Sequence, residues 1–151
     1  MARYFEDLSV GVTHEAGTFT LDREEMVGFA EQFDPQPFHV DEEAAASSVF
    51  DGLVASGLHT LCLSVRLFVT DVLAEKDIAN IGGRGMGDLR WPAPVRPDQP
   101  VAVSATVQEK TASTSRSDRG YVDFELRARR EEDDQTVLSV VLHNIVGTRP
   151  D

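Results

Sequence analysis

Apolar residues recur at helical spacing early in the chain, at Met26, Phe29, Ala30 and Phe33. Asp22 and Glu25 precede most of this run at the spacing of a capping box, in which each side chain accepts a hydrogen bond from the other residue's backbone N–H. The pattern therefore predicts a helix over about 22–33. It ends where Asp34 precedes a proline, because that position is steered away from helical dihedrals.

A second helical pattern covers residues 57–73, GLHTLCLSVRLFVTDVL, and it is apolar on nearly every side. A helix that is apolar all round is normally buried all round, so we expect this one at the centre of the fold. Cys62 is then a small core residue. It is the only cysteine, so the sequence predicts neither an internal disulfide nor a cysteine-based metal site.

The second half of the chain alternates apolar and polar residues instead. This pattern predicts strands over 101–107, 121–130 and 136–147, joined by polar turns as an antiparallel meander. The glycine-rich segment 80–91 is typical of a bent strand. The helix at 57–73 supplies the cover that the apolar face of the sheet needs. We therefore expect an α+β fold in a single domain over 1–151, with an antiparallel sheet wrapped around a central buried helix, an arrangement called the hot-dog fold.

Composition and charge narrow the possible partners. The 151 residues carry a net charge of −12, which argues against nucleic acid because its phosphates would be repelled. Lys76 and Lys110 are the only lysines, and either a high-salt environment or an arginine-preferring genome accounts for this. No run of about 18 apolar residues occurs, so we expect no membrane-spanning segment. The N-terminus lacks an apolar signal core, so we expect a cytoplasmic protein.

The segment FDPQPFHVD, residues 33–41, holds the candidate chemistry. Asp34 and His39 are separated by two prolines, which reduce the freedom of the backbone between them. A carboxylate and an imidazole can hold one water and move its proton. The residues alone also allow a plain helix-ending loop, with Asp34 and Asp41 as caps and His39 bonded locally. The histidines show no helical pair at metal-ligand spacing, so we expect no metal.

Four blocks resemble one protein family when they are taken in order: YFEDLSVG, FDPQPFHVDEEAA, FDGLVASG and GMGDLRWPAPVRPDQPV. They resemble the MaoC-like dehydratases, which include the (R)-specific enoyl-CoA hydratases. The resemblance covers about residues 4–146, and its most specific part is D-x-x-P-x-H-x-D. It implies a hot-dog fold that is usually dimeric and acts on acyl-CoA thioesters without a further cofactor.

The resemblance also implies roles for three residues. Asp34 and His39 match the pair that holds and activates water, and Gly57 matches a glycine whose backbone N–H points at the thioester carbonyl. The last role is physically reasonable, since free N–H groups at a helix start favour a developing enolate oxygen. The implied reaction is the reversible hydration of trans-2-enoyl-CoA to (R)-3-hydroxyacyl-CoA. Two positions depart from the pattern: Val65 stands where some hydratases carry serine, and Ser56 where histidine is frequent.

Substrate contacts are harder to predict from the sequence. The candidates for an acyl pocket are Phe29, Phe33, Phe38, Leu53 and Val54, and Ser56 is a further candidate for substrate binding. Those for the CoA phosphates are Arg84, Arg90 and Arg96. Each has a plainer interpretation, as a core residue or as a surface arginine paired with an acid.

Two other functions remain open on the same fold: an acyl-CoA thioesterase and a non-catalytic acyl-CoA-binding subunit. We also expect a homodimer or a higher homo-oligomer, because pairing hides an exposed sheet edge.

Overall fold

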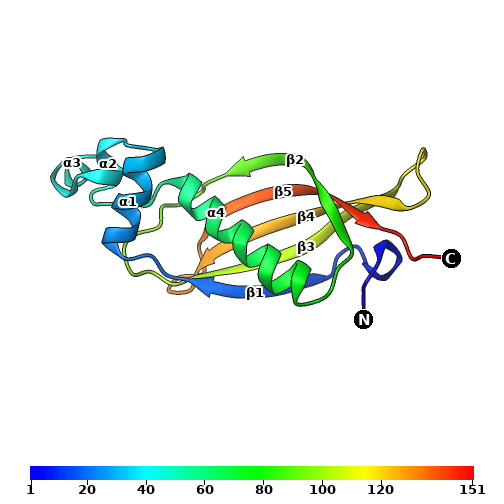
Figure 1. Cartoon of the computed structure of the whole chain (residues 1–151). Coiled ribbons are helices and arrows are strands. Elements are labelled where there is room, and N and C mark those ends of the chain that lie inside the picture. The colour runs from blue at the N-terminus through cyan, green and yellow to red at the C-terminus, as the bar shows by residue number, and fades with distance from the viewer.

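One antiparallel sheet of five strands forms the body of the molecule in a computed structural model that describes residues 1–151 (Figure 1). The strands are β1 (Thr13–Phe19), β2 (Asn80–Arg90), β3 (Val101–Ala112), β4 (Arg119–Arg130) and β5 (Thr136–Gly147). The helices are α1 (Arg23–Phe33), α2 (Pro37–Val40), α3 (Glu42–Ala46) and α4 (Gly57–Leu67), with a 3-10 turn η1 (Phe5–Asp7) and a π-helical turn η2 (Phe68–Ala74) that continues α4.

The strand order is β1-β3-β4-β5-β2, so the predicted meander β3-β4-β5 is confirmed and forms the centre of the sheet. Strand β2 pairs with β5 through three register shifts, as expected for a bent glycine-rich strand. The sequence interpretation missed β1. Of its seven residues only His14 is buried, so this edge strand lacks the apolar alternation by which strands are recognised.

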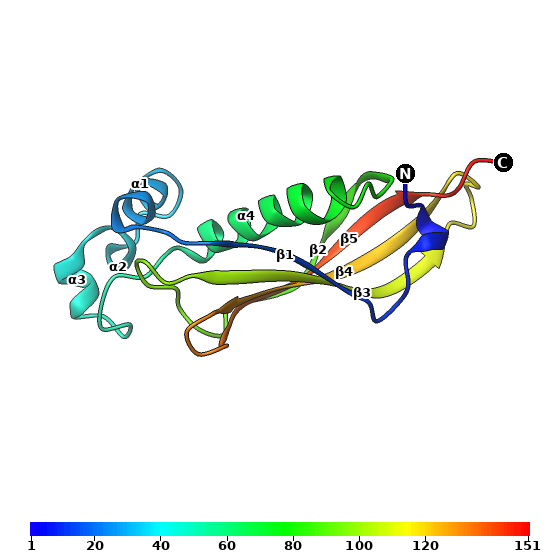
Figure 2. The same cartoon turned by 90° about the horizontal axis from the view of Figure 1, so that it is seen from below.

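The sheet curves around α4 and η2, which lie along one of its faces (Figure 2). The side chains of β4 that point to this face are fully buried, and Phe124 packs against Phe68 of η2 with ring centroids 5.0 Å apart. This arrangement confirms the predicted hot-dog fold.

The prediction that the central helix is buried all round is wrong. Leu58 is 41% exposed and Val69 46% exposed, and Cys62 is exposed rather than a core residue. The sheet covers only one side of the helix, and no other element of the chain covers the opposite side. Together, α4 and η2 form an 18-residue helix with a mean hydropathy of 1.4, which by length and composition could cross a membrane. Phe68 and Val72 nevertheless place one side of it in the core.

Three helices, α1, α2 and α3, gather at one end of the sheet (Figures 1 and 2). The predicted capping box at α1 is confirmed, since the Asp22 carboxylate accepts from the Glu25 N–H at 2.8 Å and Glu25 accepts from the Asp22 N–H at 3.3 Å. Asp41 caps α3 as predicted. The segment between these helices is not the plain helix-ending loop that the residues alone also allowed. It contains the single helical turn α2, which Pro37 begins at a position where a helix tolerates proline.

Candidate active site

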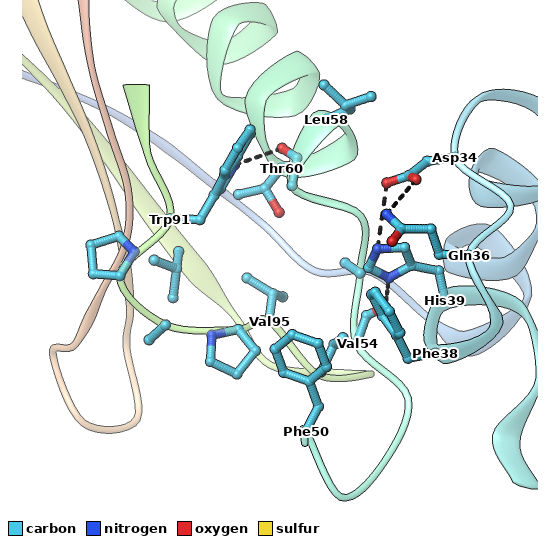
Figure 3. A pocket seen from close by; sticks show the side chains of 16 residues that line it. Asp34, Gln36, Phe38, His39, Phe50, Val54, Leu58, Thr60, Trp91 and Val95 are labelled. Carbon is cyan, nitrogen blue, oxygen red and sulfur yellow. Dashed lines mark hydrogen bonds and ion pairs between the residues drawn. The ribbon is translucent and has the colours of Figure 1, made fainter. Parts of the chain in front are cut away.

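A pocket of about 330 Å³ lies where the helical end of the molecule meets the start of α4 (Figure 3). Two backbone hydrogen bonds hold its floor together: Val54 donates to the Phe38 carbonyl of α2, and Ala55 donates to the Val95 carbonyl between β2 and β3. These bonds join three parts of the chain around the pocket, and Val137 of β5 adds a fourth to its lining. Its lining includes Asp34, Phe38, His39, Gly57, Leu58 and Trp91.

Asp34 occupies the end of α1 in a non-helical conformation, as expected before a proline. Its Oδ2 accepts a hydrogen bond from the Ser56 hydroxyl at 2.7 Å, and its Oδ1 accepts one from the Gln36 side-chain amide at 2.8 Å. These donors, with Ser56 the stronger influence, outweigh the opposing effect of partial burial and hold the pKa of the Asp34 carboxyl below its usual value. Asp34 is therefore a carboxylate at neutral pH.

His39 is buried on α2, and its Nδ1 lies 2.8 Å from the Val54 carbonyl oxygen. A carbonyl can only accept, so this contact assigns a hydrogen to Nδ1, and in the neutral tautomer with that hydrogen the lone pair is on Nε2. That Nε2 lies 3.4 Å from Oδ2 of Asp34 (Figure 3). With neutral His39, both facing atoms are acceptors. One water can satisfy both, since it has a hydrogen for each.

Gly57 is the first residue of α4, and Ser56 is the N-cap, accepting from the Leu58 N–H. The Gly57 N–H makes no hydrogen bond within the chain, as is usual in the first turn of a helix. Trp91 lies directly over Gly57 and donates its indole N–H to the Gly57 carbonyl at 2.9 Å. A Cβ at residue 57 would stand 2.4 Å from the Trp91 ring, so this close approach requires glycine.

The structure brings some of the predicted substrate residues to the pocket and not others. Phe38 and Val54 line it, and Ser56 instead bonds to Asp34. Leu53 is buried in the core, and Phe29 stacks on His59 with ring centroids 4.2 Å apart. Neither of these two residues lines the pocket.

The arginines predicted to bind phosphate lie elsewhere. Arg84 lies over the Tyr121 ring, 4.2 Å from its centroid, and Arg90 is exposed and donates to the neighbouring Leu89 carbonyl. Arg96 donates to the Phe50 carbonyl. None of them lines the pocket. No group of three or more His, Cys, Asp or Glu side chains is placed to hold a metal ion.

Sequence reasoning did not single out Gln36 or Trp91, although both stand inside the family-like blocks. Thr60 and Phe50 also line the pocket unforeseen. Only their positions in the sequence could have pointed to them. Gln36 lies between the two prolines, and Trp91 lies between the glycine-rich strand and Pro92. Gln36 bonds to Asp34, which is only two residues away, whereas Trp91 bonds to Gly57, which is 34 residues away.

The family model described as "MaoC like domain" matches residues 9–125 of the chain. The uncharacterized protein YdeM of Bacillus subtilis is 31% identical over 105 residues, which are 70% of this chain and 73% of that protein.

Two solved structures have the same fold. The crystal structure of the MaoC-like dehydratase from Rhodospirillum rubrum superposes with a TM-score of 0.90 at 38% identity, covering 99% of this chain and all of that one. The R-hydratase PhaJ1 from Pseudomonas aeruginosa, in its unliganded form, superposes with a TM-score of 0.70 at 21% identity, covering 97% of this chain and 86% of that one. The second likeness concerns the fold alone.

Proposed function

Because this chain belongs to the MaoC-like domain family, we propose that it hydrates trans-2-enoyl-CoA to (R)-3-hydroxyacyl-CoA and catalyses the reverse dehydration. The observation that carries this function is the arrangement of Asp34 and His39. Their two acceptor atoms, 3.4 Å apart, face one another at the wall of a pocket. A carboxylate and an imidazole at one wall of a pocket can together hold a water and move its proton.

The carboxylate and the imidazole have different roles in the proposed reaction. Asp34 already accepts two hydrogen bonds and remains ionised, so it orients the water rather than taking its proton. His39 presents a free Nε2 and accepts the proton as the water oxygen adds to Cβ of the enoyl group. The electrons of the double bond move to the thioester oxygen, forming an enolate. His39 then delivers the proton to Cα, so one water is added and His39 is regenerated.

The start of α4 stabilises the enolate oxygen in this reaction. The N–H of Gly57 is not engaged within the chain and lies at the positive end of the helix dipole. A fixed donor aimed at the developing negative charge stabilises the transition state more than the ground state. The Trp91 ring lies so close to Gly57 that residue 57 has no room for a Cβ, so no side chain of its own stands beside this N–H.

The lining of the pocket favours an acyl chain as the group beside the thioester. Nine of its sixteen lining residues are hydrophobic, and Phe38 and Phe50 form an aromatic pair with centroids 5.1 Å apart. The (R) configuration of the product is proposed from the family resemblance. The R-hydratase PhaJ1 shares the fold of this chain.

Crotonyl-CoA tests the function directly. The expected result is loss of the enoyl absorbance without release of free thiol, and chiral analysis of the product should give the (R) enantiomer. Thiol release with the alkene retained would instead identify a thioesterase. An absence of both reactions over a series of enoyl chain lengths, with acyl-CoA still bound, would identify a binding subunit.

We also propose that a second copy of the chain covers the exposed side of α4. The edge strand β2 carries exposed Ile81 and Met86, and the neighbouring helix exposes Leu58 and Val69. A twofold pairing would cover these apolar side chains and the unpaired edge together. Sedimentation equilibrium should then give twice the chain mass, and Cys62 should react slowly with maleimide. A monomer with a rapidly labelled Cys62 would exclude the dimer.

A further inference from the structure

A chain of hydrogen bonds runs from the wall of the pocket to the catalytic carboxylate through one peptide group of α4. Trp91 Nε1 donates to the Gly57 carbonyl at 2.9 Å (Figure 3). The N–H of the same peptide group, which belongs to Leu58, donates to Ser56 Oγ at 3.2 Å. Ser56 Oγ donates in turn to Oδ2 of Asp34 at 2.7 Å.

Ser56, in the middle of this series of hydrogen bonds, has no other partner available. Ser56 has no exposed surface, and its single hydroxyl hydrogen is committed to a carboxylate that can only accept. The lone pairs of the same hydroxyl receive the Leu58 N–H. The oxygen that Ser56 contacts, Oδ2, is also the one that faces His39. Ser56 therefore controls the orientation of the atom that meets the water.

Trp91 acts at the other end of the chain. Its ring lies against Gly57, and 45% of the side chain remains exposed at the pocket. The indole N–H is bonded to the first turn of α4 across 34 residues of sequence. This bond ties the end of β2 to the first turn of α4, in which the Gly57 N–H also lies.

We infer that Ser56 and Trp91 are positioning residues for the proposed reaction, with Ser56 orienting the Asp34 carboxylate and Trp91 orienting the first turn of α4. The inference rests on the proposed hydratase function. Because each donor polarises the next acceptor in a chain of hydrogen bonds, the two residues should act together rather than independently. Neither needs to touch the reacting atoms.

The test measures the hydration of crotonyl-CoA by S56A, S56T, W91F and the double variant S56A/W91F. A hydrogen bond to a charged group contributes about 1.5–3 kcal/mol, so S56A should lower kcat about 10- to 100-fold. KM should stay within about twofold, and S56T, which keeps the hydroxyl, should recover most of kcat. W91F keeps a ring against Gly57 but lacks the N–H donor, and it should lose a smaller factor. The double variant should lose less than the product of the single losses.

Two measurements do not depend on turnover. The carboxyl carbon of Asp34, followed by NMR, should titrate at higher pH in S56A than in the unmodified protein. Trp91 is the only tryptophan, so its fluorescence reports binding of butyryl-CoA, which cannot be hydrated. S56A should bind it as tightly as the unmodified protein does. Ser113 accepts a backbone N–H in the turn between β3 and β4 and has no carboxylate partner, so S113A is the matched control.

The outcomes separate the two claims. If the unmodified protein hydrates no enoyl-CoA, the proposed function fails, and the Asp34 titration still decides whether Ser56 sets the state of the carboxylate. If the unmodified protein is active and folded S56A keeps kcat within about twofold, the positioning role is wrong. It is equally wrong if S56A changes only KM, if S56T recovers nothing, or if the effects of S56A and W91F simply multiply. Should S56A not fold, S56T and W91F carry the same comparison.

Discussion

The chain contains two aspartate–histidine pairs, and they differ in the distance between the facing nitrogen and oxygen atoms. In the pocket, Nε2 of His39 lies 3.4 Å from Asp34, and its other nitrogen is held by the Val54 carbonyl. On the opposite, outer face of the sheet, Nδ1 of His143 on β5 bonds directly to Asp123 on β4 at 2.7 Å. The direct bond joins the two groups to one another. In the proposed reaction, the longer separation in the pocket lets both atoms accept from a third molecule.

The surroundings of the two pairs also differ, in the pocket beside each pair and in the presence of a free helix start. Asp34 and His39 lie beside a largely apolar pocket and the free N–H of Gly57. Asp123 borders a smaller polar hollow of about 220 Å³, where no free helix start is present. An acid and an imidazole in contact are thus common to both regions. The room for a substrate and the donor for its oxygen are found only in the first.

The largest effect is expected from removing the members of each pair in turn. D34N and H39A should each lower kcat/KM for crotonyl-CoA by about a thousandfold or more, because general acid–base groups contribute on the order of 10²–10⁴ and in the proposed reaction both groups share one water. D123N and H143A, the matched controls, should remain within about twofold. Comparable losses from both sets would show that the outer pair also takes part, and loss from neither would remove Asp34 and His39 from the mechanism.

A smaller effect is expected at the glycines beside the two pairs. A Cβ at Gly57 would stand 2.4 Å from the Trp91 ring, whereas a Cβ at Gly87 would stand 3.1 Å from Nε2 of His143. G57A should therefore displace Trp91 and lower kcat/KM up to about a hundredfold, since displacements near 1 Å can cost that much. G87A should stay within a few-fold.

The fluorescence of Trp91 shows whether G57A moves the ring. If steric overlap is the cause, G57A combined with W91L should recover part of the activity, because the smaller side chain leaves room for the Cβ. An unshifted emission spectrum with full activity in G57A would contradict the steric account of Gly57.

The smallest effect concerns histidines that have no carboxylate partner. Nδ1 of His59 and Nε2 of His14 are buried without a hydrogen bond, and burial lowers the pKa of both rings. Nearby Arg3 and Lys76 lower the pKa of His14 further, whereas Glu25 raises that of His59. Above about pH 6.5 both rings are largely neutral in the folded and unfolded chains, so they do not lower the free energy of unfolding. As pH falls below that value, the unfolded chain gains protons first and stability is lost.

Urea unfolding at several pH values measures this loss. Each such histidine should cost up to about 1.4 kcal/mol per pH unit below its unfolded pKa, until the folded pKa is reached. H59F keeps a ring stacked on Phe29 and removes one titrating group, so the dependence on pH should become shallower. An unchanged slope would mean that His59 takes up its proton in the folded chain as easily as in the unfolded one.

Much of the fold follows from local patterns. Asp22 and Glu25 fix the start of α1, Asp41 caps α3, and the alternation of residues 121–130 assigns β4 and its buried face. These features depend on hydrogen bonds and burial within a few residues, so short stretches of sequence are enough to predict them. Strand β1 was missed because an edge strand with one buried residue has no such pattern.

By itself, the sequence determined the order of the main helices and of strands β2 to β5, the proline-constrained segment with Asp34 and His39, and the likeness of that segment to a family. Only the tertiary structure decided that one side of α4 stays uncovered, that Arg84 lies away from the pocket, and that Ser56 bonds to an aspartate 22 residues earlier. It also placed Trp91 on Gly57. The physical reason is distance along the chain: periodicity records which side of an element avoids water, whereas the partner of a side chain depends on how distant elements pack.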